Sequence, residues 1–284
     1  MPRPHRPPSS AAVSDEALSG EESACYARHR PGLPDAAVRL PATAQHGVTA
    51  PVLLDLGTGT GQVPLALLPV LRRLTHIHLV DVSRRMPEHA LRARTPVRGT
   101  CTVTGFVGAA HTYAPAVPDR ARSLVTCCRS FHWMDRPAVL AMAARVAASH
   151  AVVAVMGDGS LWTCDAEWTA ALRDLIRSRL GTARRAGTHG TYTEPGRSFR
   201  DELAASAFGE VTRHAFPVVR NRTPEDVIGY LRTTSFARPA LLADRHQQFE
   251  ADARRLLRAH AHDGVLREEA VSEVLLARRT AGAV

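Results

Sequence analysis

The chain has 284 residues, of which 45% are hydrophobic, and this is enough for one large buried core or for a core with a cap. Its formal charge is +9, and all 36 basic residues are arginine. They are scattered, without a long run of like charges, which argues against a nucleic-acid-binding tail.

The cysteines indicate the compartment. There are five, an odd number, and no C-x-x-C spacing occurs. This pattern favours a reducing environment over a disulfide scaffold. No apolar run approaches the length of a membrane span, and residues 1–23 contain no apolar core of a signal peptide. We therefore predict a cytoplasmic protein without a membrane partner.

The amino-terminal part divides at about residue 24. Residues 1–23 combine Pro, Ser, Gly, Ala and Glu without periodicity, so we predict a disordered tail there and one domain over residues 24–284. The segment YARHRPGLP, Tyr26 to Pro34, brings an aromatic ring and arginines. A short helix is predicted to begin at Pro34 or Asp35.

The stretch LLDLGTGTGQ, residues 53–62, has the pattern of a strand, a glycine loop and a helix. Its apolar run is short enough for a buried parallel strand, which Gly57, Gly59 and Gly61 terminate. Glycine is needed where the backbone turns sharply and a ligand approaches it closely. The spacing G-x-G-x-G differs from the dinucleotide fingerprint G-x-G-x-x-G, which disfavours a pyrophosphate cofactor.

A second apolar strand, residues 77–80, is followed by Asp81. This acid stands about twenty residues beyond the glycines, where a carboxylate can accept hydrogen bonds from ribose hydroxyls. Together with the glycine loop, it predicts a nucleoside ligand without phosphates.

Strands and helices continue to alternate after Asp81. We predict a helix from Ser83 to about residue 94, strands over 100–108, 123–128 and 150–156, and a helix from Asp135 to about residue 149. Beyond residue 157 we predict a helix that includes Trp168, Leu172 and Ile176, a loop over 181–198, a strand over 208–219, helices over 224–231 and 241–257, and a last strand over 270–277. Such alternation predicts a parallel sheet with a ligand at the carboxyl ends of its strands.

Three motifs carry a resemblance to a known family: DLGTGTG at 55–61, LVDVSRRM at 79–86 and SFHWMD at 130–135. With a weaker match at YARHRPGLP, the chain resembles the class I S-adenosylmethionine-dependent methyltransferases, most closely their bacterial small-molecule branch, over about residues 25–157. The resemblance implies a doubly wound, mostly parallel, seven-stranded Rossmann-like α/β sheet with its last strand antiparallel and a helical cap. The cofactor-binding half would span about 50–157, and the cap and acceptor-binding elements about 24–46 and 158–260.

The resemblance also implies S-adenosyl-L-methionine as the cofactor. Tyr26 and Arg30 would close over it, with Arg30 meeting its carboxylate. Residues 108–111, Gly-Ala-Ala-His, stand where the family often has Gly-Asp-Ala-Glu, whose acidic residue recognises the adenine amino group. Backbone groups at Ala110, or His111 itself, would replace that contact. The predicted cofactor-binding residues are Tyr26, Arg30, Asp55, Gly57, Thr58, Gly59, Gly61, Gln62, Asp81, Val82, Met86, Ala110 and His111.

Methyl transfer from a sulfonium depends mainly on aligning the reactants, and a base helps when the nucleophile is a hydroxyl or an ammonium group. His132, within SFHWMD, is the candidate base; the alternative is a histidine that only packs or holds the loop. We predict no metal site, because residues 129–132 lack the carboxylates that metal-dependent methyltransferases need there.

We therefore expect an enzyme that methylates an O, N or C nucleophile of a small organic molecule, in secondary metabolism, as a monomer or homodimer without a nucleic-acid partner. Two alternatives stay open: a methyltransferase fold that catalyses another reaction, such as cyclisation, and a nucleic-acid methyltransferase. SFHWMD differs from the Asn/Asp-Pro-Pro-aromatic loop of amide-methylating nucleic-acid enzymes. The acceptor is expected near the aromatic and hydroxyl residues Trp162, Trp168, Tyr192, Tyr230, Thr233, Thr234, Ser235 and Phe236.

Overall fold

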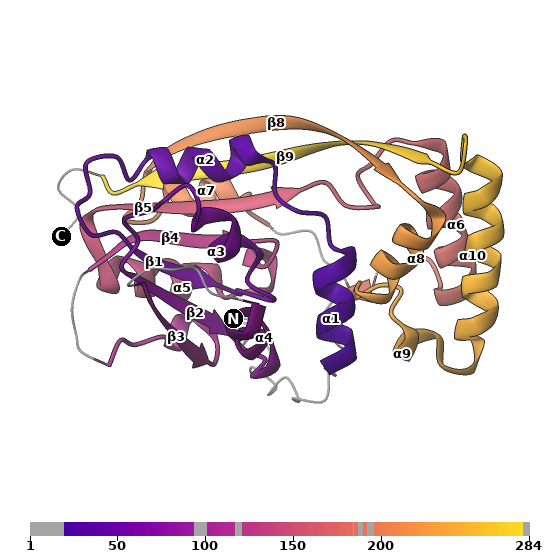
Figure 1. Cartoon of the computed structure of the whole chain (residues 1–284), viewed down its shortest axis with the longest axis horizontal. Helices are drawn as coiled ribbons and strands as arrows, with labels where there is room; N and C mark the ends of the chain where they lie inside the picture. Colours follow the sequence, from indigo (N-terminus) through magenta and orange to yellow (C-terminus); the bar gives the residue numbers. More distant parts are fainter. Residues whose placement is uncertain are drawn as a thin grey trace, which may run out of the picture.

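A seven-stranded sheet forms the centre of the molecule (Figure 1). The computed structural model describes residues 20–93, 101–116, 121–183, 185–186, 190–191 and 196–280. The strand order is β3-β2-β1-β4-β5-β9-β8. The strands are β1 Val52–Leu56, β2 His76–Asp81, β3 Thr102–Val107, β4 Arg122–Cys128, β5 Ala147–Asp158, β8 Glu210–Arg222 and β9 Leu266–Arg278. Only β9, the last strand, runs antiparallel to the others, which confirms the predicted fold class.

Helices cover both faces of the sheet, and this explains why the inner strands are buried on both sides and mostly apolar. All five residues of β1 are buried. Because side chains alternate along a strand, Leu53 joins the core on one face and Leu54 the core on the other. The first face is covered by α2 Asp35–Thr43, α3 Gln62–Leu67 and α4 Arg85–Ala93, and the second by α5 Arg136–Val146 and α7 Phe199–Ala204.

Beyond the sheet lies a helical cap with its own apolar core. Its helices are α6 Glu167–Leu180, α8 Pro224–Arg232, α9 Pro239–Leu242 and α10 His246–His260. Their core includes Leu172, Ile228 and Phe249, all of which are buried. Helix α1, Gly20–His29, contacts α4 of the sheet region and α8 of the cap, and lies between the two in Figure 1.

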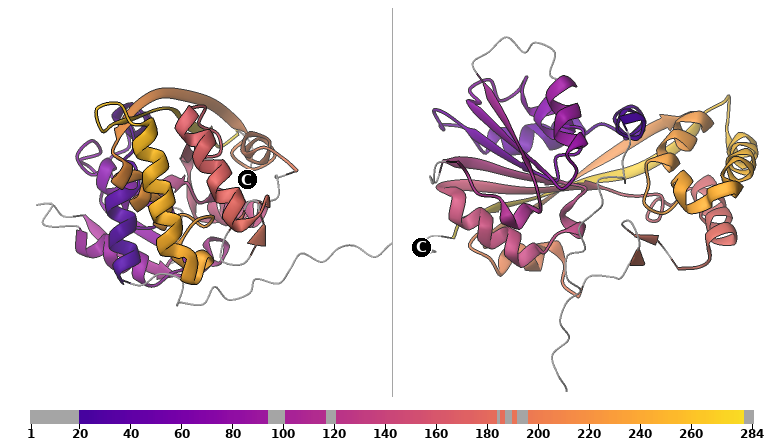
Figure 2. Two further views of the ribbon diagram at one scale, coloured as in Figure 1. Left: turned by 90° about the vertical axis from the view of Figure 1, so that its right-hand side faces the viewer. Right: turned by 90° about the horizontal axis from the view of Figure 1, so that it is seen from below.

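Strands β8 and β9 connect the sheet to the cap (Figure 2). The pairing of β5 with β9 ends at Asp158 and Ser272, whereas β8 and β9 remain paired as far as Arg222 and Leu266. The two strands therefore leave the sheet as a two-stranded ribbon, whose far end joins α8 through Thr223.

Several boundaries differ from the predictions. Strand β5 begins at Ala147 rather than at residue 150, because the small residues after α5 continue as a strand that pairs with Arg122 across a register shift. The helix predicted over 241–257 is divided into α9, a 3₁₀ turn and α10, because Ala243 adopts a positive φ of 48° that a helix cannot accommodate. Helix α3 ends at Leu67.

Two predicted regions fall partly outside the described residues. Of the tail predicted over 1–23, only the start of α1 at Gly20 is described. In the loop predicted over 181–198, the described part includes a small antiparallel pair, β6 Arg185–Ala186 and β7 Gly190–Thr191. Within the described ranges, no helix has the length and apolar character needed to cross a membrane.

Candidate functional site

The three glycines after β1 serve different purposes. All have positive φ, 63° for Gly57, 53° for Gly59 and 82° for Gly61. A Cβ at Gly57 would lie 2.5 Å from the side chain of Ser130, and one at Gly61 would lie 2.7 Å from the Cβ of Ala90. At Gly59 the added atom would meet open space. The outer two glycines therefore permit close packing, and the middle one faces the region where a ligand can approach.

Asp55, at the base of the glycine loop, is 1% exposed and forms hydrogen bonds within the protein. The hydroxyls of Thr58 and Thr126 donate to its two carboxylate oxygens, each at 2.6 Å. Burial raises the pKa of Asp55 to about 6, although the two hydroxyls act in the opposite direction. The hydrogen bond between Thr58 and Asp55 thus fixes the glycine loop to the end of β1.

Asp81, the last residue of β2, forms a hydrogen bond with the glycine loop. Its Oδ2 accepts the backbone N–H of Gly59 at 2.9 Å, and its Oδ1 accepts that of Ser83 at 3.0 Å. Burial raises the pKa of Asp81, against the effect of these N–H bonds. The carboxylate is partly exposed next to Gly59, so a further acceptor position stays within reach of a ligand hydroxyl.

The other predicted cofactor residues differ in accessibility. Val82 is 50% exposed at the carboxyl edge of the sheet. Met86 and Ala110 are buried, at 4% and 7% exposure, whereas His111 is partly exposed in the 3₁₀ turn Ala110–Thr112. The side chains of Val82 and His111 are therefore accessible to a ligand. Met86 and Ala110 can contact one mainly through their backbone atoms.

His132 lies in the 3₁₀ turn Phe131–Trp133, which follows β4. Phe131 is buried against Phe199 of α7 and anchors this turn, with the ring centroids 5.2 Å apart. The side chains of His132 and Trp133 are exposed, and their rings lie 4.3 Å apart. The turn therefore presents His132 to solvent at the edge that carries the glycine loop.

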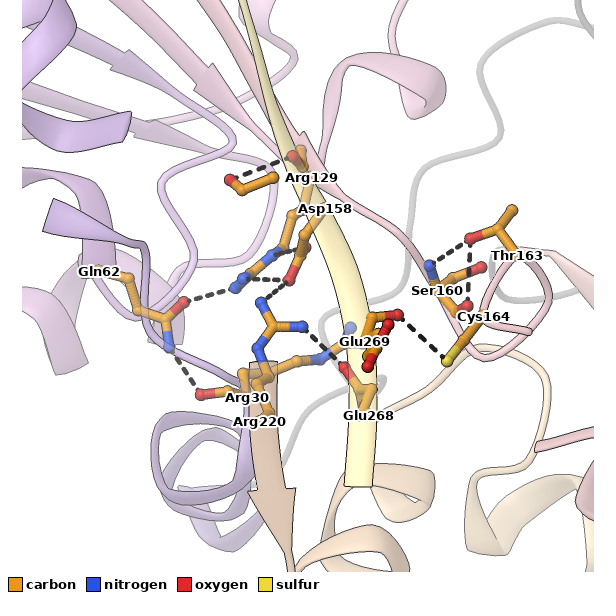
Figure 3. Close-up of polar contacts among 12 residues, drawn as sticks. Arg30, Gln62, Arg129, Asp158, Ser160, Thr163, Cys164, Arg220, Glu268 and Glu269 are labelled. Atoms are coloured by element: carbon orange, nitrogen blue, oxygen red, sulfur yellow. Dashed lines mark hydrogen bonds and ion pairs between the residues drawn. The ribbon is translucent and has the colours of Figure 1, made fainter. Parts of the chain in front are cut away.

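Sequence reasoning missed a buried ionic network that begins at Arg129, directly after β4. Arg129 has a left-handed φ of 57°. Its guanidinium donates twice to Asp158, at 2.6 and 2.9 Å, and once to the side chain of Gln62 at 2.9 Å. Gln62 in turn donates to the backbone carbonyl of Arg30 at 3.3 Å. Figure 3 shows how these contacts join the glycine-loop helix to the end of β5.

The network continues onto the strand ribbon. Arg220 of β8 donates to Asp158 at 2.6 Å and to Glu268 of β9 at 2.8 Å (Figure 3). Arg222 donates to Glu268 at 3.2 Å. Burial would raise the pKa of Asp158, but Arg129 and Arg220 outweigh it and hold that pKa below its usual range. The signal in the sequence was the period of two in Arg220 and Arg222, which places both on one face of a strand.

Arg30, just beyond α1, reaches toward the cap. Its Nη2 donates to the carbonyl of Thr233 at 2.9 Å, and its guanidinium lies 4.8 Å from the ring of Tyr26 and 5.0 Å from that of Tyr230. The predicted pair Tyr26 and Arg30 is therefore close together and next to the glycine-loop helix, through the contact of Gln62 with the Arg30 carbonyl.

Several of the expected acceptor residues belong to the core of the cap. Trp168 and Phe236 are buried there, and the indole N–H of Trp168 donates to the carbonyl of Arg267 at 2.9 Å. Trp162 packs against Phe236 with ring centroids 5.3 Å apart. Of the described residues on that list, Tyr230 and Thr233 are the ones in contact with Arg30. Tyr192 is outside the described residues.

Comparisons with known proteins agree with this arrangement. Residues 53–150 match the family model of a methyltransferase domain. No curated protein sequence matches the chain. Among solved structures, a candidate type II methyltransferase from Anaeromyxobacter dehalogenans is similar with a TM-score of 0.58 and 19% identity, covering 88% of this chain and 97% of that one. A candidate methyltransferase from Bacillus halodurans gives a TM-score of 0.51 and 16% identity, covering 86% and 98%.

A third structure, of Haemonchus contortus phosphoethanolamine N-methyltransferase 2 with phosphomonomethylethanolamine and S-adenosylhomocysteine, has a TM-score of 0.52 and 14% identity. It covers 94% of this chain and 57% of that one. The matched family model begins in β1 and contains the glycine loop, Asp81 and His132. Residues 53–150 are therefore similar to a methyltransferase domain, and the chain has the Rossmann-like fold of these solved methyltransferases, as its motifs predicted.

Proposed function

We propose that this protein transfers the methyl group of S-adenosyl-L-methionine to an O, N or C nucleophile of a small organic molecule, in secondary metabolism. The observation that carries the proposal is the glycine loop. Gly59 faces open space with its N–H held by Asp81, at the carboxyl edge of a methyltransferase domain.

The residues around the loop fit this cofactor. Gly59 leaves room for a close backbone approach, and Asp81 can accept ribose hydroxyls beside it. Val82 offers an exposed apolar surface to a base, with His111 on the neighbouring turn. Arg30, near the glycine-loop helix, can pair with a carboxylate. When bound, S-adenosylmethionine supplies an electrophilic methyl group on a positively charged sulfur.

The chain contributes alignment and proton transfer. The loop and Asp81 hold one reactant in a fixed position, which is where most of the rate acceleration of an in-line displacement arises. His132 is exposed at the same edge and can take the proton of a hydroxyl or ammonium nucleophile. Its role as a base is part of the proposal.

The small-molecule acceptor is supported by the cap. Helix α1 packs against both α4 and α8, and Arg30, just beyond α1, lies next to the glycine-loop helix. The cap therefore borders the cofactor loop, and a site between the two suits a small molecule better than a polymer. One solved structure of the same fold contains a small-molecule ligand together with S-adenosylhomocysteine, which is consistent with this assignment.

Calorimetric titration with S-adenosylmethionine and S-adenosylhomocysteine tests the cofactor. We expect micromolar binding that weakens at least tenfold in Gly59→Val and in Asp81→Ala. Wild-type affinity in both variants would refute the assigned site. Arg213→Gln, an exposed change on the far strand β8, is the control that should leave binding unchanged.

The reaction and its base need separate measurements. Protein incubated with methyl-labelled cofactor should label a metabolite extract and leave total RNA and DNA unlabelled. Label in nucleic acid alone would support the nucleic-acid alternative, and tight cofactor binding without any transfer would support a non-methylating reaction. His132→Gln should reduce turnover while cofactor affinity and melting temperature stay at wild-type values. Turnover equal to that of wild type would show that His132 is not the base and only packs or holds the loop.

A further inference from the structure

Four arginines from three separate segments meet where the sheet joins the cap. Arg30 follows α1, Arg129 follows β4, and Arg220 and Arg222 lie near the end of β8. The side chains of Arg129, Arg220 and Arg222 are only 12%, 13% and 9% exposed. Guanidinium groups this deeply buried are unfavourable unless negative charge lies next to them.

The carboxylates in this arginine cluster do not balance its positive charge. Asp158 is shared by Arg129 and Arg220, and Glu268 is shared by Arg220 and Arg222. Among the described residues, three guanidinium groups therefore pair with two carboxylates. Asp226 lies near Arg222, but it is exposed and its carboxylate caps the first turn of α8 by bonding to Thr223.

Arg30 adds a fourth positive charge. Within the described part of the chain its Nε is buried and without a hydrogen-bond partner, and its Nη2 is bonded to a neutral carbonyl. The guanidinium of Arg30 lies close to the rings of both Tyr26 and Tyr230, and the guanidinium of Arg222 lies 4.9 Å from the ring of Tyr230. Tyr230 thus contacts two guanidinium groups, and no carboxylate of the described residues forms an ion pair with Arg30.

The arginine cluster is adjacent to the cofactor loop. Gln62 follows Gly61 directly, and it contacts both Arg129 and the backbone of Arg30. Arg129 is held there in a left-handed conformation, which costs energy in a non-glycine residue and often marks a functional site. The proposed cofactor cannot supply the missing negative charge, because its single carboxylate is outweighed by an ammonium and a sulfonium group.

We propose that the arginine cluster is the acceptor subsite for an oxyanion, so that the methyl acceptor is a small molecule carrying a carboxylate or a phosphate. This inference rests on the proposed function and narrows its substrate class. Guanidinium groups bind both oxyanions through paired N–H donors. In this assignment Arg30, whose Nε has no hydrogen-bond partner among the described residues, binds the oxyanion of the acceptor and not the carboxylate of the cofactor. The acidic group would be anchored at the cap side, which leaves the nucleophile directed toward the glycine loop.

Arg220→Gln tests the inference with little disturbance to the ion pairs. It removes the shared guanidinium, so Asp158 keeps Arg129 and Glu268 keeps Arg222. Arg213→Gln is the matched control, because Arg213 is on the same strand with its side chain 59% exposed and paired with Glu273. Melting temperatures and S-adenosylhomocysteine affinity of both variants establish that each is folded and binds the cofactor product.

The binding arm uses protein saturated with S-adenosylhomocysteine. Benzoate, citrate and phenyl phosphate are titrated calorimetrically, with benzamide as the neutral counterpart of benzoate. We expect at least one oxyanion to bind wild type and the Arg213→Gln control, to bind Arg220→Gln at least tenfold more weakly, and benzamide not to bind. Preference for phenyl phosphate over the carboxylates, or the reverse, identifies the oxyanion. Absence of binding by all three oxyanions would overturn the inference.

The transfer arm uses a metabolite extract divided by anion exchange at neutral pH and incubated with methyl-labelled cofactor. Label is expected in the retained acidic fraction, with a KM at least tenfold higher in Arg220→Gln and a smaller change in kcat. Label confined to the unretained fraction would overturn the inference while supporting methyl transfer. Failure of the protein to bind S-adenosylhomocysteine would instead remove the proposed function on which the inference depends.

Discussion

Asp55 shows how one buried carboxyl group can couple the loop to pH. Its folded pKa of about 6 lies above the value of about 4 expected for an unfolded chain. Between pH 4 and pH 6 the folded protein therefore binds a proton at Asp55 more tightly than the unfolded chain does. The stabilisation is present in acid and is lost as the pH rises through about 6.

We predict that Asp55→Asn removes this pH dependence. Between pH 4 and pH 7, the free energy of unfolding of wild type should fall by about 2 kcal/mol relative to that of Asp55→Asn. Urea denaturation of both proteins at several pH values measures the difference. Thr126→Val, which deletes a hydrogen bond that favours the charged form, should move the change to higher pH. Parallel profiles for wild type and Asp55→Asn would contradict the assignment.

The glycine loop allows a second test at single residues. Gly61→Ala combines a positive φ with a contact to Ala90 that is too short, so we expect a loss of about 2 to 4 kcal/mol. Gly59→Ala meets open space and should lose only the conformational term of about 1 to 2 kcal/mol, yet weaken cofactor binding. Chemical denaturation and calorimetry separate the two effects. The opposite order of stability would show that Gly59 is the packed position.

Among the elements, α1 depends on one glycine of a neighbouring helix. A Cβ at Gly229 of α8 would overlap the ring of His29, and the thiol of Cys25 donates to the Gly229 carbonyl. Glycine in a helix costs about 1 kcal/mol relative to alanine. At position 229 this loss of helix propensity allows the close packing of α1 against α8. Burial lowers the pKa of His29, which keeps the contact with α8 uncharged at neutral pH.

We predict that Gly229→Ala displaces α1 although it improves the helix propensity of α8. Hydrogen exchange over residues 20–30 should accelerate at least tenfold, while exchange in the β1 and β4 core stays slow. The double variant His29→Ala with Gly229→Ala should restore protection, because it removes the ring that the new methyl group overlaps. Unchanged exchange in Gly229→Ala would mean that α1 is held by its other contacts.

The elements also show what the sequence could predict. Residues 53–156 alternate cleanly between apolar strands and helices, so the glycine loop, Asp81 and His132 were placed at the correct edge of the sheet. The long strands were underestimated. β8 was predicted to end at residue 219 and β9 to begin at residue 270, because charged residues usually mark the ends of strands. Arg220 and Glu268 instead pair across the two strands, and that partnership depends on a register that no local pattern reveals.

At the scale of the whole molecule, Asp158 joins the sheet to the cap. It receives hydrogen bonds from Arg129, at the loop after β4, and from Arg220, on the ribbon that leads to α8. Its lowered pKa means that the negative charge contributes stability above the unfolded pKa of about 4, and that this contribution is lost as the pH falls through the folded value.

We predict that Asp158→Asn destabilises the protein by about 3 kcal/mol at pH 7, because two buried guanidinium groups lose their partner. The difference from wild type should shrink at pH 3, below the unfolded pKa of about 4, because the unfolded chain takes up a proton there that the folded carboxylate binds less readily. Denaturation curves at both pH values measure this, and limited proteolysis locates the loosened region. A difference that does not change with pH would contradict the charge-based explanation. Asp174→Asn, at an exposed carboxylate on α6, is the control for stability at pH 7.

The position of β9 has a consequence for synthesis of the chain. β9 lies inside the sheet between β5 and β8, yet it is made after both of them. Until β9 emerges, the outer edge of β5 and the whole of β8 are unpaired strands, which are prone to associate with other chains. The long sequence separation between β5 and β9 also makes their pairing slow. The chain is therefore expected to be most prone to association in the interval between the completion of β8 and the insertion of β9.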